Sequence, residues 1–281
     1  MKFDVSNAHQ RKAPFVSTNF MTTAIRHITM IILTALLFGK TYAQDTTTTN
    51  FFDQIKTFDL STIWTADSIF AEDNEDNKDK IKRMEPIGFI GDDFQRFYIH
   101  FTLVKKQKDK PNEYFVKGKT KVKSTTCDFE GTIKVTTARL YKEGDLAKYK
   151  QGFAICEVTF YEDKKQPSTG IIKGKLTTHF IIDDKQKFRY DALSFVADGF
   201  ANNEFEGNWT SYKTNKTKVC NWGDYRIPNS KDLDTGAGEF SVDDKYVKNG
   251  WENYKLAWSG GGADNTDAQK ARQIEFEQWW K

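Results

Sequence analysis

Apolar and polar side chains alternate with a period of two along the middle of the chain, the pattern of β-strands with one buried face. The alternation runs from Phe97 to Leu103 and again from Val116 to Lys123, with polar turn residues between them. It returns in five more segments, at Cys127–Val135, Phe153–Tyr161, Ile171–Ile182, Phe188–Val196 and Phe205–Lys213. No helical pattern separates these segments, so we expect antiparallel neighbours joined by short turns.

Glycine recurs at equivalent positions inside four of the predicted strands, each time preceded by an apolar and a charged residue and followed by a polar residue and one on the apolar side of the strand. The four positions are Gly118, Gly131, Gly174 and Gly207. An interior glycine weakens a flat strand and is typical of points where a sheet bends. Closure of a bent meander removes its exposed edges. We therefore predict an all-β, mainly antiparallel fold: a meandering β-barrel with short N- and C-terminal helices, with a β-sandwich as the alternative.

Segments without steady alternation flank the predicted strands. Phenylalanines at helical spacing predict a short packing helix over Phe51–Phe58, and the charged run Glu72–Lys80 predicts a solvated loop. The segment Cys220–Trp258 indicates loops or short strands packed on the barrel. A final helix is expected from Thr266 or Asp267 to the end of the chain.

The chain contains a second methionine, Met21, followed by basic residues, an apolar run over 28–39 and a small residue at Ala43. This arrangement predicts a secretory signal peptide cleaved after Ala43, because the apolar run is too short to span a bilayer. We expect a secreted or periplasmic protein. The predicted divisions are an over-long start at 1–20, the signal peptide at 21–43, a lead-in with a first strand region at 44–95, the barrel core at 96–214, and a loop-rich C-terminal region with its helix at 215–281.

Cleavage changes the charge of the protein. The whole chain has 42 basic and 39 acidic residues, and the leader contains five of the basic ones and one acidic one. Subtracting these leaves 37 and 38, a net charge near −1. A nucleic-acid-binding protein needs a clustered basic excess, so we expect no nucleic-acid partner. The mature chain also contains no second run long enough for a transmembrane span.

Cysteine and histidine provide little chemistry in the mature chain. Cys127, Cys156 and Cys220 have no zinc-like spacing, and an oxidising compartment permits a disulfide between Cys127 and Cys156 or leaves them as buried thiols. His100 and His179 lie on separate predicted strands, where structural roles are expected. No nucleophile elbow, phosphate loop or zinc-protease motif is present in the sequence.

Two charged groups are candidate binding sites. Lys117, Lys119, Lys121 and Lys123 share one predicted strand face, which suits a polyanion or, equally, cross-strand pairs with acidic neighbours. Alternating aspartates before glycine, with Glu239 downstream, resemble the start of a Ca²⁺ loop but do not complete the EF-hand spacing. Ca²⁺ is the only cofactor suggested, and a polar turn is the alternative. The candidate ligands are Asp232, Asp234 and Glu239.

The strand rhythm with interior glycines, from about Arg96 to Lys213, resembles lipocalin-type (calycin-like) barrels, and Gly207-Asn208-Trp209 matches the Gly-x-Trp element of that family. The resemblance implies a small apolar molecule held in the barrel mouth by inward-facing aromatic side chains. The candidate lining residues are Phe97, Phe129, Trp209 and Tyr212, for each of which ordinary core packing is the alternative.

Our leading hypothesis is an exported, non-catalytic β-barrel that binds a small apolar ligand or a cell-envelope component. One alternative is a secreted glycan-active enzyme that uses a pair of carboxylates drawn from residues such as Glu113, Glu157 and Asp191. Another is a structural or partner-binding envelope protein that offers Trp279 and Trp280 near its C-terminus to a protein partner.

Overall fold

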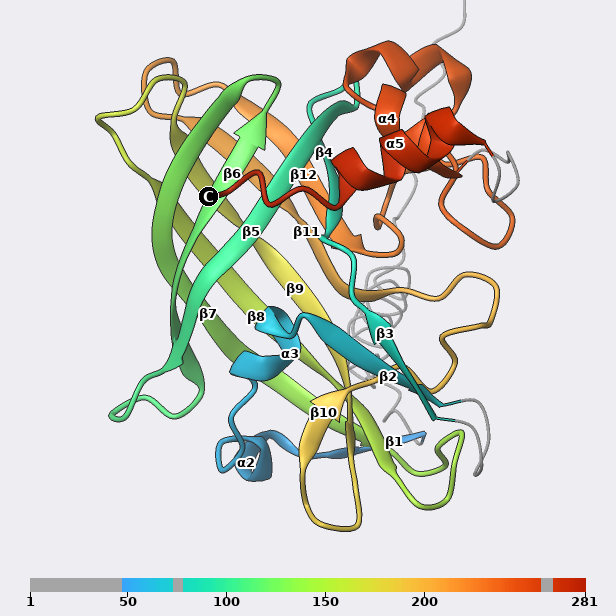
Figure 1. Ribbon diagram of the computed structural model, residues 1–281. Coiled ribbons are helices and arrows are strands. Elements are labelled where there is room, and N and C mark those ends of the chain that lie inside the picture. Colours follow the sequence, from blue (N-terminus) through green and yellow to red (C-terminus); the bar gives the residue numbers. More distant parts are fainter. Residues whose placement is uncertain (1–46, 73–77, 259–264) are drawn as a thin grey trace, which may run out of the picture. The chain divides into compact units, whose positions relative to one another are not determined.

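The computed structural model describes residues 47–72, 78–258 and 265–281, and most of this chain is antiparallel β-structure (Figure 1). Eight strands pair in sequence order, and the last of them pairs with the first, which closes the sheet into a barrel. The predicted meandering barrel is therefore confirmed. Its strands are β4 (Ile87–Ile90), β5 (Gln95–Lys106), β6 (Glu113–Val122), β7 (Thr125–Tyr141), β8 (Lys150–Glu162), β9 (Gly170–Ile182), β11 (Asn202–Ser211) and β12 (Thr217–Asp224).

The barrel extends beyond the predicted core of 96–214 at both ends. β4 and β12 complete the ring, whereas β10 (Phe188–Tyr190) pairs only with β9 and lies outside it. All four residues of β4 are buried, and so are the last five of β12. Strands buried on both faces lose the alternation that reveals one-sided strands, so the pattern missed these two.

The recurring glycines lie where the barrel wall bends. Gly174 of β9 and Gly207 of β11 are register partners, and a Cβ atom added to either would lie 2.2–2.4 Å from a carbonyl oxygen of the facing strand. The ring of Phe205 covers both positions from the barrel interior and stacks on Trp222, with ring centroids 3.6 Å apart. Strand glycines thus permit a backbone approach that other residues would block.

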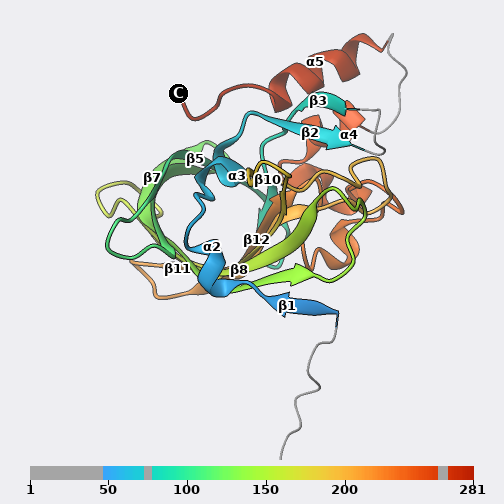
Figure 2. The ribbon, with the colours of Figure 1, turned by 90° about the horizontal axis from the view of Figure 1, so that it is seen from below.

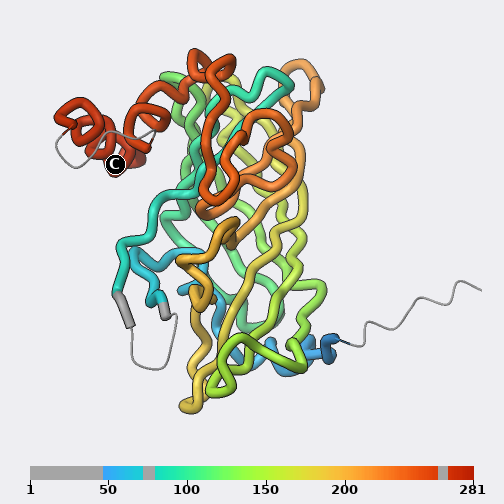
Figure 3. The backbone as a smooth tube through the Cα atoms, turned by 90° about the vertical axis from the view of Figure 1, so that its right-hand side faces the viewer, coloured from blue at the N-terminus to red at the C-terminus, as the bar shows by residue number. Residues whose placement is uncertain are grey.

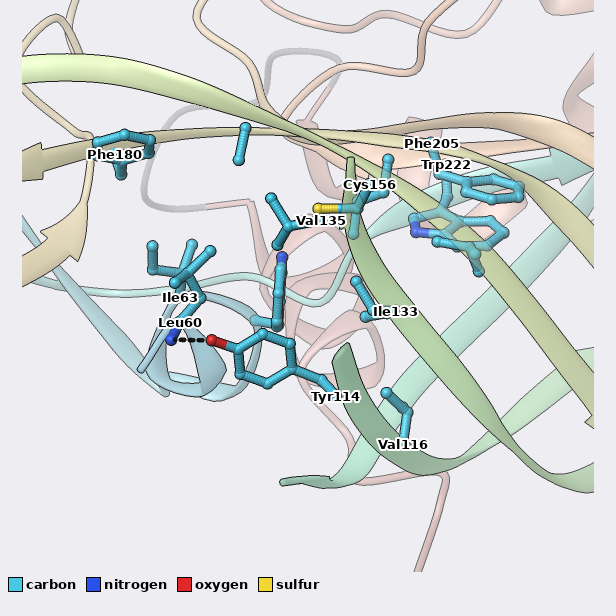
Figure 4. Packing of buried hydrophobic residues seen from close by; sticks show 14 of the residues in the cluster. Leu60, Ile63, Tyr114, Val116, Ile133, Val135, Cys156, Phe180, Phe205 and Trp222 are labelled. Carbon is cyan, nitrogen blue, oxygen red and sulfur yellow. Dashed lines mark hydrogen bonds between the residues drawn. The ribbon is translucent and has the colours of Figure 1, made fainter. Parts of the chain in front are cut away.

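An N-terminal segment closes one end of the barrel (Figures 1 and 2). It contains β1 (Thr48–Asn50), which pairs with β7, and the short helices α2 (Phe52–Ile55) and α3 (Ser61–Thr65). Figure 4 shows the side chains of Leu60 and Ile63 among the inward residues of the strands, and the Leu60 amide donates to the hydroxyl of Tyr114 at 3.0 Å. The barrel is therefore filled at this end by its own chain.

A buried polar network joins this closure to the barrel wall. The Asp224 carboxylate accepts hydrogen bonds from Asn203 (2.7 Å), Tyr190 (3.1 Å) and Arg83, whose Nη2 lies 3.3 Å away. The Trp64 indole donates to Thr178 at 2.9 Å, and Thr178 donates to Asn203. Buried polar groups are stable when paired, so this network positions α3 against β9, β11 and β12.

The C-terminal segment packs on the outer face of the barrel around β4 and β5. A second apolar core forms there between Ile87 and Phe89 of β4 and residues such as Trp251, whose indole donates to the Phe94 carbonyl at 2.8 Å. Figure 3 shows this segment at the upper end of the barrel. Its elements are the 3₁₀ turns η1 (Lys231–Leu233) and η2 (Asp244–Asn249) and the helices α4 (Glu252–Trp258) and α5 (Thr266–Glu275).

Three further predictions have different outcomes in the structure. The charged run is a hairpin of β2 (Ser68–Glu72) and β3 (Lys78–Lys82) within its described part, so it is not simply a loop. The final helix ends at Glu275, before the two terminal tryptophans. The leader and signal peptide lie outside the described residues. Within those residues, no helix has both the length and the apolar character needed to cross a membrane.

Candidate functional site

A pocket of about 360 Å³ opens at the barrel end opposite α2 and α3, beneath the turns that join β4 to β5, β6 to β7 and β8 to β9. Its volume is within the range of small-molecule sites. Inward side chains of the strands form its walls, and the turns form its rim. The lining residues include Ile90, Phe97, Thr120, Val122, Cys127, Glu162 and Trp209, with Asp93, Lys123 and Lys218 at the rim.

Glu162, the last residue of β8, is the polar centre of this pocket. Its side chain follows Val158 and Phe160 on the inward face, and the residue is 5% exposed. Thr120 donates to one carboxylate oxygen at 2.5 Å, and the other oxygen accepts from the Gly170 amide and the Trp209 indole, both at 2.8 Å. Glu162 therefore links β6, β8, β9 and β11 across the mouth.

Burial raises the pKa of the Glu162 carboxyl, while hydrogen bonds from Thr120, Trp209 and Gly170 act in the opposite direction. Because the effect of burial is larger than that of the hydrogen bonds, the ionised carboxylate of Glu162 is less stable here, relative to its protonated form, than in water. Three donors nevertheless satisfy its oxygens, which is the condition for keeping a carboxylate at a buried position.

The structure brings two of the four predicted lining residues together at the mouth. Phe97 and Trp209 both line the pocket, and the Trp209 ring is held in place by its hydrogen bond to Glu162. The lining role was expected from the resemblance to lipocalin-type barrels, with core packing as the alternative, and Phe97 also belongs to the core, where it is 1% exposed.

The other two predicted lining residues lie elsewhere. Phe129 is inward but stacks on Phe160, with ring centroids 4.7 Å apart, below the mouth. Tyr212 follows β11 in a turn, and Lys164 lies 4.9 Å from its ring centre. Both residues line a more open groove together with Lys117.

The rim of the pocket is cationic. Lys123 and Lys218 contact the pocket, and neither forms an ion pair with the part of the chain that the structure describes. Lys218 is inward, because its register partner is Trp209. Asp93 is the one rim carboxylate among the lining residues. The mouth thus presents an apolar wall, a fixed carboxylate below and two ammonium groups above.

The lysines of β6 are mostly engaged with the barrel wall. Lys119 lies 3.0 Å from Asp128 and Lys117 lies 3.8 Å from Glu130, across the β6–β7 ladder, as cross-strand pairing predicts. Lys121 contacts the ring of Tyr98. Lys123 departs from this face because it has a positive φ of 54° and forms the turn into β7.

Two of the three residues proposed as calcium ligands, Asp232 and Asp234, form ion pairs with cationic side chains. Asp234 accepts from Arg226 and from the Gly236 and Ser241 amides, which orders its loop. Asp232 accepts from Lys245 at 2.6 Å and from Tyr246. Glu239 is exposed and forms no ion pair in the described chain. No cluster of three or more ligand-type side chains suited to a metal ion occurs in the described residues.

The three cysteines are free and buried, so the Cys127–Cys156 bridge is not formed in the structure. Cys156 pairs in register with Val135, which lies eight positions along β7 from Cys127. At about 3.3 Å per residue, roughly 26 Å separates the two sulfur positions, far beyond disulfide reach. Burial raises the pKa of the Cys127 thiol to about 11. Near neutral pH this thiol is therefore protonated and unreactive, and its side chain serves as part of the pocket lining.

The remaining candidates have structural contacts. His100 lies 2.9 Å from Glu85 and stacks on Trp280, with ring centroids 3.7 Å apart, while Trp279 packs on Tyr98. Burial lowers the pKa of His179, which keeps it neutral near pH 7. Among the carboxylates considered for an enzyme, Glu113 and Glu157 lie on either side of Lys134, and Asp191 accepts from Gln151 at 2.7 Å.

Sequence reasoning missed Glu162, although a signal for it was present. Glu162 continues the inward phase of Val158 and Phe160, so a carboxylate stands in line with the apolar face of its strand. Its partners could not be found in this way, because Trp209 and Thr120 are 47 and 42 residues away in sequence.

Comparisons of the chain with protein-family models, with curated proteins and with solved structures found no match. The barrel mouth therefore has to be interpreted from its own geometry.

Proposed function

We propose that the barrel mouth binds a small, mainly apolar molecule that carries an anionic group. The observation that supports this most directly is the 360 Å³ pocket whose wall includes Phe97 and the Trp209 ring, which is held by its hydrogen bond to Glu162. Apolar walls with a few placed polar groups are typical of sites for small ligands. Lys123 and Lys218 at the rim favour an anionic head group on the part of the ligand that faces water.

The cellular setting of this proposal is export. Cleavage of a signal peptide after Ala43 would deliver a mature chain that begins at Gln44 to the periplasm or the extracellular space. The intact mass and N-terminal sequence of protein recovered from that compartment test this step. A chain that retains residues 21–43 there would contradict cleavage. Native mass spectrometry of the same material would reveal a retained ligand.

The binding proposal is tested with 8-anilinonaphthalene-1-sulfonate, a probe that combines aromatic rings with one sulfonate. Val122 points into the pocket, whereas Val219 on β12 is 43% exposed and lies beside the inward Cys220, so it points outward. We expect Val122→Trp to fill the mouth and weaken probe binding about tenfold or more, and Val219→Trp to change it less than about twofold. Fluorescence titration measures both, with circular dichroism confirming that the variants fold.

Equal binding by the wild type and Val122→Trp would reject the mouth as the site. The charge of the ligand is tested separately with Lys218→Gln, which removes one rim cation without adding bulk. We expect this variant to weaken the sulfonate probe about threefold to tenfold and to leave an uncharged naphthylamine probe unchanged. Equal effects on the two probes would show that the rim does not select anions.

A further inference from the structure

A second pocket, of about 410 Å³, lies outside the barrel and shares no lining residue with the mouth. Its walls come from the segment just before β4 and the first residue of that strand, from the loop after β10, from the residue that follows β12 and from the C-terminal segment. Aromatic rings dominate these walls. They belong to Phe195, Phe200, Tyr225, Phe240, Tyr254 and Trp258.

Three of these rings form one cluster at the pocket. Tyr225 lies 5.2 Å from Phe195 and 5.3 Å from Phe200 between ring centroids, and Phe195 and Phe200 are also 5.3 Å apart. Tyr225 has a φ of 66°, in the left-handed region that bulky residues seldom adopt. The backbone at the end of β12 therefore turns unusually to place this ring against the loop after β10.

Every charged side chain that lines the pocket is acidic: Glu85, Asp198 and Glu239. Glu85 lies 2.9 Å from His100, but Asp198 and Glu239 are exposed and form no ion pair within the described chain. The Asp198 side chain lies against Gly238, and the Gly199 amide donates to the Gly238 carbonyl at 2.8 Å. The two carboxylates are thus presented on loops that contact each other.

The same region already holds one cation among aromatic faces. The Arg96 guanidinium lies 4.3–5.0 Å from the rings of Trp251, Tyr254 and Tyr98. Its Nη2 forms an ion pair with Glu275 at 3.0 Å, whereas within the described residues its Nε and Nη1 have no hydrogen-bond partner, so the rest of the guanidinium lies among ring faces. Tyr254 takes part in this aromatic box and also lines the second pocket.

We infer that the second pocket binds an alkylated ammonium cation, such as a quaternary ammonium group on a small molecule. Aromatic faces attract a cation, alkyl groups on its nitrogen fit an apolar wall, and the carboxylates of Asp198 and Glu239 supply the countercharge. No lysine, arginine or histidine lines the pocket to repel such a ligand. The carboxylates of this pocket would repel an anionic ligand, so the site differs in chemistry from the mouth, where the rim charges are lysines.

The test compares choline with 3,3-dimethylbutan-1-ol, in which carbon replaces the ammonium nitrogen. NMR titration of the isotope-labelled protein measures both affinities and locates the shifted amides. We expect choline to bind about threefold to thirtyfold more tightly than the alcohol, with shifts centred on residues 195–200 and 225. Equal affinities, or shifts confined to other regions, would overturn the inference.

Variants separate charge from packing. Asp198→Asn with Glu239→Gln should weaken choline binding about threefold or more and leave the alcohol unchanged. The matched control, Asp92→Asn with Asp184→Asn, removes the same charge from exposed turn residues outside the pocket and should leave both affinities unchanged. Equal losses in the two double variants would show a general charge effect and reject the site.

Independence from the barrel mouth is tested with Val122→Trp. This variant should bind choline like the wild type, because Val122 lines only the first pocket of the two. If Val122→Trp abolishes choline binding, the cation occupies the mouth and the inference fails. Loss of the sulfonate probe with retention of choline in this variant is the expected result.

Discussion

At the residue scale, Glu162 decides the character of the barrel mouth. One carboxylate accepts from Thr120, from the Trp209 indole and from the Gly170 amide, and so fixes a side chain from β6 and one from β11. The burial that makes the mouth apolar also raises the pKa of this carboxyl. Geometry and electrostatics at the site therefore depend on the same residue.

Two substitutions of Glu162 separate its charge from its hydrogen bonds. Glutamine retains an oxygen for Trp209 and Gly170 and turns its amide to the Thr120 hydroxyl, so we expect Glu162→Gln to change the unfolding free energy by less than about 1 kcal/mol at pH 7. Alanine leaves all three donors without this partner and removes packing, so Glu162→Ala should lose about 2–4 kcal/mol. Urea denaturation measures both. Equal losses would contradict the role assigned to the three hydrogen bonds.

The raised pKa of Glu162 also predicts a pH dependence. Below about pH 4 the carboxyl is protonated in both the folded and the unfolded states. As pH rises, the unfolded state releases its proton first, so the wild type loses stability until pH passes the higher folded pKa. Glu162→Gln lacks this loss and should gain stability relative to the wild type between pH 4 and pH 7. An unchanged difference over that interval would contradict the burial argument.

At the element scale, the strands are shaped by glycines that face each other across the sheet. Gly174 and Gly207 are register partners, and the Phe205 ring covers them from inside. A flat strand would keep the sheet open, whereas a bend at these positions brings β12 round to β4. The Phe205 ring in turn stacks on Trp222 in the barrel core.

We expect Gly207→Ala to destabilise the protein by more than about 2 kcal/mol, because the new Cβ would lie 2.4 Å from the Lys173 carbonyl oxygen. Gly144→Ala is the matched control. It adds the same methyl group in the loop between β7 and β8, where the nearest heavy atom is 3.3 Å away, and should change stability by less than about 0.5 kcal/mol. Similar effects of the two substitutions on urea unfolding would argue against a required close approach.

At the scale of the whole molecule, the C-terminal segment and the barrel form one packed unit around a buried ion pair. Arg96 of β5 and Glu275, the last residue of α5, are 3% and 5% exposed at their side chains and lie 3.0 Å apart. Trp279 and Trp280 extend this contact along β5 onto Tyr98 and His100. The terminal tryptophans, predicted to dock on something, contact the barrel of their own chain.

Removal of one partner from this ion pair should be more harmful than removal of both. Glu275→Gln leaves the Arg96 charge buried without its counterion, and we expect a loss of about 3–5 kcal/mol in unfolding free energy. The double variant Arg96→Met, Glu275→Met should lose less than Glu275→Gln, because no buried charge remains. A double-mutant cycle of Arg96→Met, Glu275→Met and the double variant, measured by urea denaturation, gives this coupling. Additive losses would show that the pair does not link α5 to the barrel.

Sequence reasoning reached much of the barrel but only part of the site. Alternation located six of the eight ring strands, β11 among them, because a half-buried strand shows its two faces directly in the sequence. It missed β4, whose outer face lies under Trp251 and its neighbours. Of the four aromatic residues proposed as lining, Phe97 and Trp209 line the mouth and Phe129 and Tyr212 line the open groove, since alternation gives the facing of a residue and not its depth in the barrel.

The sequence by itself determined the facing of most strand residues and the bends at the glycines, because both follow from local backbone geometry with a period of two. Only the tertiary structure decided which strands close the ring, which residues meet Glu162 and how the rings of the second pocket gather around Tyr225. These depend on register and on contacts between distant segments, as between Glu162 and Trp209, 47 residues apart. A local sequence pattern does not show which distant segments contact each other, so neither pocket could be predicted from the sequence.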